Sequence, residues 1–360
     1  MTDQSTKATS IALDIMGGDL GPEEAMLGAK MALDQKWIDG KLILVGKEEI
    51  IEEFLEREKL TNDPRIEVFP ASEVIGMDEK PIPSIKQKKD ASLVRAIELV
   101  KIGNCSAAVS CGNTGSLMAC STIRLRPLEG VSKPALATVW PSRENHFVLL
   151  DAGANPQCKA ENLFQYAVLG NLYAKTALNI ENPRVGLLSI GTEEGKGNDL
   201  NRESHELLKK LGKKINYIGQ IEGFQLFNNE VDVVVTDGFT GNIVLKSCES
   251  LWKMLKVLIK EEATLNPIRK IGALGFVGTM KGVKSRLNPD DFAGAPLLGL
   301  GGTVLKAHGS SNRSYIANAI RIAGLTIKAD LKEQSEKDIA EANAILSQIE
   351  SQESDSSSKK

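Results

Sequence analysis

Short apolar runs, several ending in a glycine-containing turn, limit the possible folds more than any other feature. They predict β-strands at residues 10–16, 41–46, 66–69, 107–111, 135–140, 146–151, 185–190 and 231–237. Most of these runs are apolar almost throughout and do not alternate with polar residues. Continuous apolar runs are typical of strands that are covered on both faces.

Helix-length segments separate most of the predicted strands. They lie at residues 22–35, 47–59, 84–102, 114–125, 160–178, 199–211 and 241–262, and residues 313–349 predict one long helix or two. Strands alternating with helices predict an α/β protein with a doubly wound, mostly parallel sheet. Residues 135–151 contain two strands and no helix, so we expect an antiparallel hairpin there.

Composition narrows the domain organisation and the function. Hydrophobic residues make up 42% of the 360 residues, enough for a large core. No linker rich in Pro, Gly or Ser interrupts residues 10–345, so we predict one α/β domain over residues 10–347 and a disordered tail at residues 348–360. The net charge of −3 argues against a nucleic-acid-binding polycation.

The spacing of cysteines and histidines and the hydropathy of the chain predict whether the protein has a metal site and where in the cell it lies. The five cysteines form no C-x-x-C pair and the three histidines have no ligand-like spacing, so we expect no metal site. Scattered thiols suggest a reducing compartment. The first ten residues lack the apolar core of a signal peptide, and no run approaches the roughly 18 apolar residues of a membrane span. These features predict a cytoplasmic protein.

Six glycine-containing turns follow predicted strands or apolar runs, at residues 14–19, 110–115, 151–156, 189–198, 236–242 and 306–311. In an open α/β sheet, turns at the carboxyl ends of strands gather where ligands bind. Glycine lets the backbone approach a ligand, and the helix that follows offers N–H groups to an anion. One such turn is usually only a tight connection. Six turns with polar neighbours favour a phosphate-binding pocket.

Several common active sites are missing. The chain has no G-x-x-x-x-G-K-[ST] loop, its first turn reads G-G-D where a dinucleotide site has G-x-G-x-x-G, and it has no G-x-S-x-G elbow. These absences argue against a P-loop NTPase, a dinucleotide site at the first turn and catalysis by a serine triad.

The turns lie in blocks that resemble a known family. The segments IALDIMGGDLGPEEAMLGA, VSCGNTGSLMA, LLDAGANPQCKAENLFQYAVLG, VGLLSIGTEEGKGNDL, VDVVVTDGFTGNIVLK and GAPLLGLGGTVLKAHGSS are similar, in this order, to blocks of the PlsX family of phosphate acyltransferases. The resemblance runs from about residue 11 to about residue 323.

The resemblance implies both a fold and a reaction. The implied fold has three α/β/α layers and is related to phosphotransacetylases and isocitrate dehydrogenase, with a helical extension. The implied enzyme is a homodimer that moves a fatty acyl group from acyl carrier protein to inorganic phosphate and needs no cofactor. It also implies a role in phospholipid synthesis and peripheral association with an anionic membrane.

The implied reaction assigns candidate catalytic residues. Phosphate is itself the nucleophile, so the site must hold it beside the thioester and stabilise an oxyanion. Lys196, in a G-K-G turn, either neutralises these charges or is a solvated loop lysine. Asn242 either caps the helix that follows or donates to the substrate. His308 either protonates the leaving thiolate or holds its turn.

A second set of residues is expected to bind substrate or to hold the turns through side-chain-to-backbone hydrogen bonds. It comprises Asp14, Gly17, Gly18, Asp19, Asn113, Thr114, Gly115, Asp151, Asn155, Asp237, Gly238, Thr240 and Gly241.

Residues 263–289 form a basic and apolar segment without any acidic residue. We expect Leu274, Phe276 and Val277 to contact an anionic membrane, and the alternative is that they pack in the core or in a dimer. Four glycines in this segment favour two shorter helices over one. The lysines at positions 209, 210, 213 and 214 either dock the acidic carrier protein or complement a helix dipole.

Three other functions remain open from the residues alone. One is a phosphotransacetylase-like transferase that uses a short acyl-CoA. A second is a metal- and NAD-dependent dehydrogenase with Asp232 and Asp237 as metal ligands, although no clear ligand set is present. The third is a non-catalytic membrane scaffold.

Overall fold

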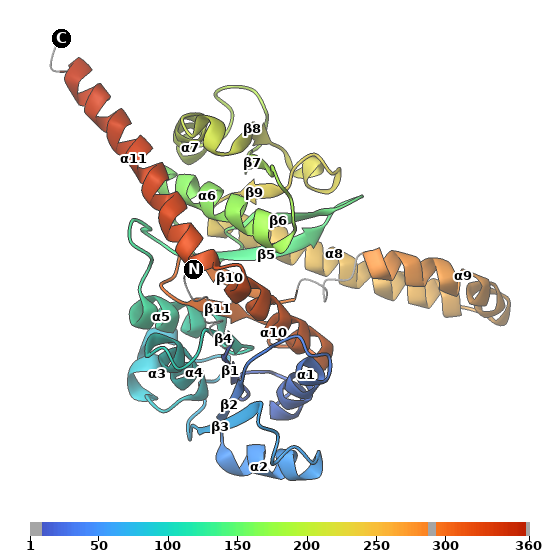
Figure 1. Cartoon of the computed structure of the whole chain (residues 1–360). Helices are drawn as coiled ribbons and strands as arrows, with labels where there is room; N and C mark the ends of the chain where they lie inside the picture. The colour runs from blue at the N-terminus through green and yellow to red at the C-terminus, as the bar shows by residue number, and fades with distance from the viewer. Residues whose placement is uncertain (1–8, 287–292, 358–360) are drawn as a thin grey trace, which may run out of the picture.

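The protein is built on one mixed sheet. The computed structural model describes residues 9–286 and 293–357 (Figure 1). Its 11-stranded sheet has the order β3-β2-β1-β4-β11-β10-β5-β6-β9-β7-β8. The strands are β1 (Ile11–Asp14), β2 (Leu42–Gly46), β3 (Ile66–Pro70), β4 (Ala107–Ser110), β5 (Ala135–Pro141), β6 (His146–Leu150), β7 (Arg184–Leu188), β8 (Asn216–Ile221), β9 (Val233–Val235), β10 (Ala295–Leu298) and β11 (Thr303–Lys306).

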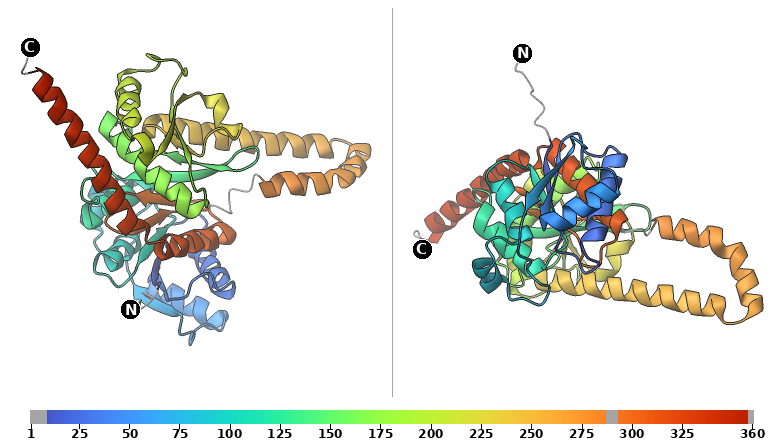
Figure 2. Two further views of the ribbon diagram at one scale, coloured as in Figure 1. Left: turned by 45° about the horizontal axis from the view of Figure 1, so that its top comes forward. Right: turned by 90° about the horizontal axis from the view of Figure 1, so that it is seen from below.

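Helices cover both faces of this sheet, as the three-layer prediction requires (Figures 1 and 2). They are α1 (Pro22–Asp34), α2 (Glu48–Arg57), α3 (Pro81–Gln87), α4 (Ser92–Lys101), α5 (Thr114–Leu125), α6 (Ala160–Ala177), α7 (Asp199–Lys209), α8 (Gly238–Thr264), α9 (Pro267–Arg286), α10 (Arg313–Lys328) and α11 (Leu331–Ser357). Two short 3₁₀ helices, η1 (Gly212–Lys214) and η2 (Gly223–Phe227), flank β8.

The core is divided between the two ends of the sheet. Around β1, β2 and β4, fully buried residues such as Leu13 and Ile320 join α1, α2 and α10 to one face. Around β6, β7 and β9, residues such as Phe164 and Tyr166 join α6 and α7 to the sheet. A further cluster on the opposite face includes Leu117 of α5 and Val234 of β9, so it spans both ends. The continuous apolar strand runs are thus explained by burial on both faces.

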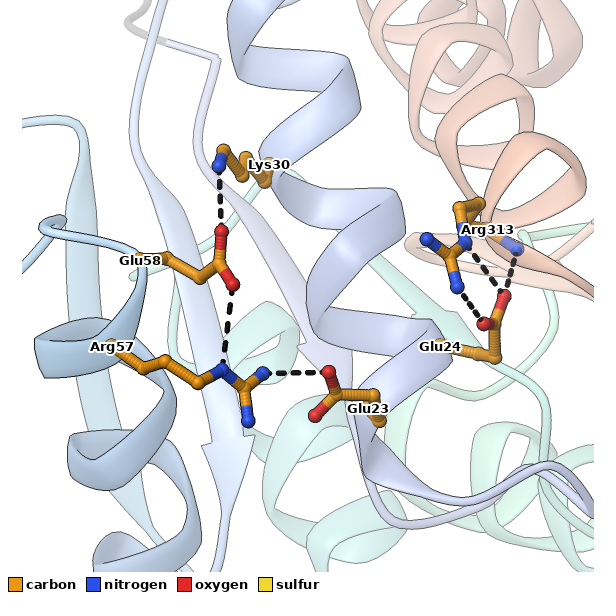
Figure 3. A network of polar contacts seen from close by, with 6 residues as sticks. All are labelled: Glu23, Glu24, Lys30, Arg57, Glu58 and Arg313. Atoms are coloured by element: carbon orange, nitrogen blue, oxygen red, sulfur yellow. Dashed lines mark hydrogen bonds and ion pairs between the residues drawn. The ribbon is translucent and has the colours of Figure 1, made fainter.

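Ion pairs tie the starts of α1 and α10 together (Figure 3). The Arg313 backbone N–H donates to Glu24 Oε2 at 2.7 Å, and the two side chains form an ion pair. Next to them, the Arg57 Nη2 of α2 lies 2.6 Å from Glu23 Oε1. Three of these side chains are about half exposed and Glu24 is less so, and ion pairs open to solvent add little stability. Their effect is to hold together the helices that follow the first and the last glycine turns.

The strand predictions hold at all eight positions, and the antiparallel hairpin of β5 and β6 is confirmed. Strands β8, β10 and β11 were not predicted. The predicted helix at residues 84–102 is wrong, because it is split into α3 and α4. The split lies where Asp90 Oδ2 accepts from the Ser72 N–H at 2.9 Å and Asp90 N–H donates to Glu73, so contacts with a distant loop replace helix hydrogen bonds.

The helical extension is a hairpin of α8 and α9, which runs away from the rest of the molecule (Figures 1 and 2). The prediction of two short helices after residue 263 is wrong, since α9 is one helix through all four glycines. No atom lies within 4 Å of a Cβ placed at any of them, so they are not required for close packing.

The end of the chain, predicted as one long helix or two, forms two helices. Residues 313–349 form two helices that meet at Asp330, whose positive φ of 46° ends α10. Helix α11 then continues to Ser357, into the segment where a disordered tail was predicted. Among the residues described, no helix is long and apolar enough to cross a bilayer.

Candidate functional site

The site is created by the way the two halves of the sheet are joined. Strands β1, β4 and β11 are parallel to one another, and so are β6, β9 and β7. Between them, three successive antiparallel pairings lead from β11 through β10 and β5 to β6. The two parallel halves therefore run in opposite directions. A simple doubly wound sheet, as predicted, would have all its carboxyl ends at one edge.

The register brings the two sets of carboxyl ends together. Lys306, at the end of β11, pairs with Ala295, at the start of β10. Two residues further along β10, Leu297 pairs with Leu136 of β5, whose N–H donates to Asp151 Oδ1 at 3.2 Å. Asp151 directly follows β6. The ends of β11 and β6 are thus separated by two strands, or roughly 14 Å, with a shift of about 7 Å along the strand direction.

A row of polar side chains ends the first half. Asp14, Ser110 and Lys306 are the last residues of β1, β4 and β11, and they are register partners. The Ser110 hydroxyl donates to Asp14 Oδ2 at 2.6 Å and accepts from the Gly112 N–H at 3.0 Å. Burial raises the pKa of the Asp14 carboxyl, against the hydrogen bonds from Ser110 and its neighbours. Asp14 therefore holds the turn after β4, as one of its two predicted roles requires.

Lys306 is a buried cation in this row. It exposes 7% of its surface, and its Nζ donates to the carbonyls of Cys111, at 3.3 Å, and Ala307. Burial lowers the pKa of its ammonium to about 8, because the charged form loses hydration that two carbonyls only partly replace.

Glycines allow the first, second and last turns to meet. A Cβ at Gly17 would lie 2.6 Å from the Gly112 N and 2.7 Å from Asp14 Oδ2. Gly18 faces Cys111 and Gly309, and the Asp19 N–H donates to the Gly309 carbonyl at 2.8 Å. The predicted convergence of turns is confirmed for these three.

The start of α5 completes this group. Asn113 is its N-cap and accepts from the Ser116 N–H at 2.9 Å, while its amide donates to the Met77 carbonyl. Thr114 and Gly115 form the first turn of α5, and a Cβ at Gly115 would lie 2.7 Å from Pro81. Both polar atoms of the Asn113 side chain are thus hydrogen-bonded to backbone groups of the protein.

A second group of turns ends the other half. The buried Asp151 carboxylate accepts from the N–H groups of Gly153, Ala154 and Asn155 at 2.8–3.0 Å. The Asn155 amide donates to Asp151 Oδ2 and to the Pro134 carbonyl. Burial is the main cause that raises the Asp151 pKa, and the hydrogen bonds oppose it. Both side chains are committed to shaping this turn.

The start of α8 packs directly on that turn. The Gly238 N–H donates to the Asn155 carbonyl at 2.9 Å, and a Cβ at Gly241 would overlap the Asp151 carbonyl oxygen. The N-cap is Asp237, which accepts from the Thr240 N–H at 2.9 Å and from its hydroxyl at 2.8 Å. The prediction that Asn242 caps this helix is therefore wrong.

Asn242 lies in the second turn of α8, on the surface. Its side chain stands over Gly153, 3.2 Å from where a Cβ there would be. This position leaves the amide of Asn242 next to backbone that only a glycine permits to come so close.

Helix α8 also reaches the first group of turns. The charges of Lys246 and Glu249 act on His308, whose pKa is lowered chiefly by burial. The Ser310 N–H donates to His308 Nδ1 at 3.2 Å, so Nδ1 is an acceptor and the ring proton resides on Nε2. A neutral ring with its proton on Nε2 suits a hydrogen-bond donor better than an acid.

Lys196 stands apart from both groups. Its turn follows β7, and its exposed side chain runs past Gly191. Asn198 caps α7 by accepting from the Asn201 N–H at 2.9 Å. No hydrogen bond or ion pair among the described residues joins this turn to the others. The structure thus brings three of the six predicted turns into contact in one group and two more in a second group.

Two other predicted sets have local partners. Lys209 pairs with Glu194 and Glu206, and Lys214 pairs with Glu341 at 2.6 Å, which weakens the case for carrier docking there. Asp232 pairs with Arg184 at 2.8 Å. Within residues 9–286 and 293–357, no three His, Cys, Asp or Glu side chains gather in a way that would hold a metal ion.

The sequence analysis missed Lys306 and Ser110 as site residues. Both stand in the quoted turns but were assigned no role. One signal was available for Lys306. This lysine ends the apolar run T-V-L-K, which is typical of a buried strand, and lysine is rarely buried without a partner.

Replacing Gly17 with alanine tests the close approach of the turns. We expect Gly17→Ala to lower the free energy of unfolding by about 1–3 kcal/mol, because backbone atoms of Gly112 cannot move away as a flexible side chain would. Chemical denaturation measures the effect. Gly223→Ala is the matched control, since nothing lies within 4 Å of a Cβ there. Equal stability of the two variants would contradict the packing argument.

Comparisons with known proteins agree with this architecture. A family profile described as "Fatty acid synthesis protein" matches residues 9–334. A phosphate acyltransferase of Desulfitobacterium hafniense is 44% identical over 91% of this chain and 97% of its own. One of Halothermothrix orenii is 42% identical over 91% and 99%, and one of Akkermansia muciniphila is 38% identical over 93% and 97%.

Solved structures confirm the fold class. A phosphotransacetylase from Streptococcus pyogenes superposes with a TM-score of 0.59 at 17% identity, over 90% of this chain and 95% of that one. A branched-chain phosphotransacylase from Enterococcus faecalis superposes with a TM-score of 0.55 at 12% identity, over 88% and 99%. At such low identity the likeness concerns the fold alone.

Proposed function

We propose, on the premise that this chain belongs to the fatty acid synthesis protein family of phosphate acyltransferases, that it transfers a fatty acyl group from acyl carrier protein to inorganic phosphate. The chain is an acyltransferase. Its proposed product is an acyl phosphate that supplies the acylation of glycerol 3-phosphate in phospholipid synthesis.

The proposed reaction needs no nucleophile from the protein. A phosphate oxygen forms a bond to the thioester carbonyl carbon, the carbonyl electrons move onto its oxygen, and their return breaks the carbon–sulfur bond. The carrier leaves as a thiolate and takes a proton from phosphate or solvent. The protein therefore has to bind an anion, align it and stabilise a transient oxyanion.

One observation supports this proposal: glycine turns from both halves of the sheet lie on either side of the two antiparallel strands that reverse its direction. They combine the start of α5, the start of α8 and the buried Lys306 ammonium. Backbone N–H groups at helix starts together with a cation are suited to bind phosphate.

A direct assay tests the proposed activity. We expect the purified chain, with palmitoyl-acyl carrier protein and labelled phosphate, to form labelled acyl phosphate that hydroxylamine traps as a hydroxamate. Acetyl-CoA in place of the acyl carrier protein is the control for a short-chain transferase. Activity with acetyl-CoA alone, or with neither donor, would contradict the proposal.

Roles for the three candidate catalytic residues follow from their positions. We assign the Asn242 amide, exposed over Gly153, to donate to the acyl or phosphate oxygen. His308 has its Nδ1 engaged by Ser310, so its proposed role becomes hydrogen-bond donation from Nε2. Lys196 lies on an exposed loop, from which its side chain would have to reach the substrate on binding.

The Lys196 role is tested by Lys196→Ala. We expect at least about a tenfold loss of turnover without loss of folded protein, because one cation that faces developing charge is worth this much or more. Steady-state kinetics and circular dichroism measure the two effects. Lys101→Ala, an exposed lysine at the end of α4, is the matched control. Near-normal turnover of the Lys196 variant would remove this residue from the mechanism.

We propose that the hairpin of α8 and α9 serves peripheral membrane contact and dimer formation. On α9, Leu274 is 72%, Phe276 53% and Val277 44% exposed, so these side chains do not belong to the core of this chain. Arg269 and Lys281 lie on the same helix, and a basic, apolar helix suits an anionic surface. On α8, Leu251 and Met254 are about half exposed and are available to a second copy.

The membrane role is tested by replacing both Leu274 and Phe276 with glutamate. We expect the double variant to lose sedimentation with phosphatidylglycerol vesicles while it keeps activity on soluble acyl carrier protein, because two charges must then leave water. The same changes at Ile102 and Leu325, also exposed, are the control. Unchanged vesicle binding would refute the proposed contact.

A further inference from the structure

The buried ammonium of Lys306 has no carboxylate partner among the described residues. Its Nζ donates to two carbonyls, of Cys111 and Ala307, and an ammonium carries three protons. Among the residues that the structure describes, no ion pair within 4.0 Å joins this Nζ to a carboxylate. Asp14 and Asp19 act on Lys306 only as more distant charges.

Such a residue is unusual on energetic grounds. A lysine is almost never buried to this degree without a paired anion, because the lost hydration costs several kcal/mol. Its neighbour Asp14 is committed elsewhere, since its Oδ2 accepts from Ser110 and its Oδ1 from the Met16 N–H. The missing partner of the ammonium must therefore come from outside the chain or not at all.

The position of Lys306 indicates which partner fits. The Cys111 carbonyl that it binds precedes Gly112 and the start of α5, so Nζ lies at the base of the turn that leads into this helix. From the other side, the charge of Lys246 on α8 acts on it. A second cation and a helix start around one buried ammonium favour a small, multiply charged anion.

We propose that Lys306 binds the inorganic phosphate of the reaction, so that the substrate supplies the counter-charge that the chain withholds. The proposal rests on the proposed function, and it adds a phosphate-binding residue to it. The phosphate would accept a hydrogen bond from the third proton of Nζ. The two carbonyls hold the ammonium in place before the substrate arrives.

Equilibrium binding of phosphate, without any acyl donor, tests this role. We expect Lys306→Met to raise the phosphate Kd at least about tenfold in isothermal titration calorimetry. The variant should keep its melting temperature or exceed it, because methionine removes a buried charge while it conserves volume. Lys101→Met, at an exposed position, controls for the loss of one positive charge. A Kd within about twofold of the wild type would overturn the proposal.

A second measurement uses the wild type and does not depend on the variant folding. Burial lowers the Lys306 pKa to about 8, so one pH unit higher most of the free protein carries a neutral amine. Phosphate that binds there should draw a proton onto Lys306. Titration in buffers of different ionisation enthalpy measures this uptake. Binding without proton uptake, with a Kd that does not rise with pH, would overturn the proposal.

Other groups around Lys306 set the background of this measurement. They are Asp14 and Asp19 from the first turn, Cys111 after β4, Lys246 and Glu249 on α8, and His308 in the last turn. Burial raises the Cys111 thiol pKa to about 12, and the His308 pKa is lowered, so neither changes charge near pH 8. Proton uptake that the wild type shows and Lys306→Met lacks is thus assigned to Lys306.

The outcomes separate this inference from the proposed function. A wild type that forms acyl phosphate, combined with a Lys306→Met variant that binds phosphate normally, refutes only the role of Lys306. A wild type that neither binds phosphate nor forms acyl phosphate refutes the proposed function and the inference with it.

Discussion

The reversal of the sheet between β11 and β6 is the constraint on which the rest of the structure depends. Parallel strands place all their carboxyl ends at one edge, so a uniform sheet of this size would spread its turns along a line. Here β10 and β5 run antiparallel between two parallel halves. Their pairings leave Lys306 and Asp151 on either side of β10 and β5, with a shift of about 7 Å along the strand direction. Turns from opposite ends of the chain therefore meet in the middle of the sheet.

This meeting requires backbones to approach closely, which explains where the glycines fall. Gly17 faces Gly112, Gly18 faces Gly309, and Gly241 rests on the Asp151 carbonyl. At Gly17 and Gly241 a Cβ would press on backbone atoms, whereas at Gly18 it would make ordinary van der Waals contacts, so main chain packs directly on main chain at two of these positions. Carboxylates such as Asp151 and Asp237 then bind the N–H groups that the tight turns leave free. The polar residues beside the glycines are mainly the supports of the site.

The sequence predicted the turns well, because their cause is local. An apolar run followed by Gly and Asp or Asn reports a strand end directly, and all eight predicted strands exist. The sequence did not predict the features that depend on contacts between residues far apart in the chain. The helix break at Asp90 depends on Ser72, and β10 and β11 exist because each pairs with a strand far away in the chain. The burial of Lys306 was not predicted for the same reason, since it depends on pairing with Ser110 and Ala295.

The buried charge of Lys306 also links the stability of the fold to the proposed binding of phosphate. The Lys306 pKa of about 8 lies below its ordinary value of 10.5, so between these two values the unfolded chain binds more protons than the folded one. Stability from this group therefore rises with pH across that window, and the burial penalty is present in full below it. At neutral pH the protein without a bound anion therefore carries the full cost of burying the Lys306 ammonium. An anion that binds only the folded state would offset that penalty, so under the proposed role the same buried charge that weakens the free fold strengthens phosphate binding.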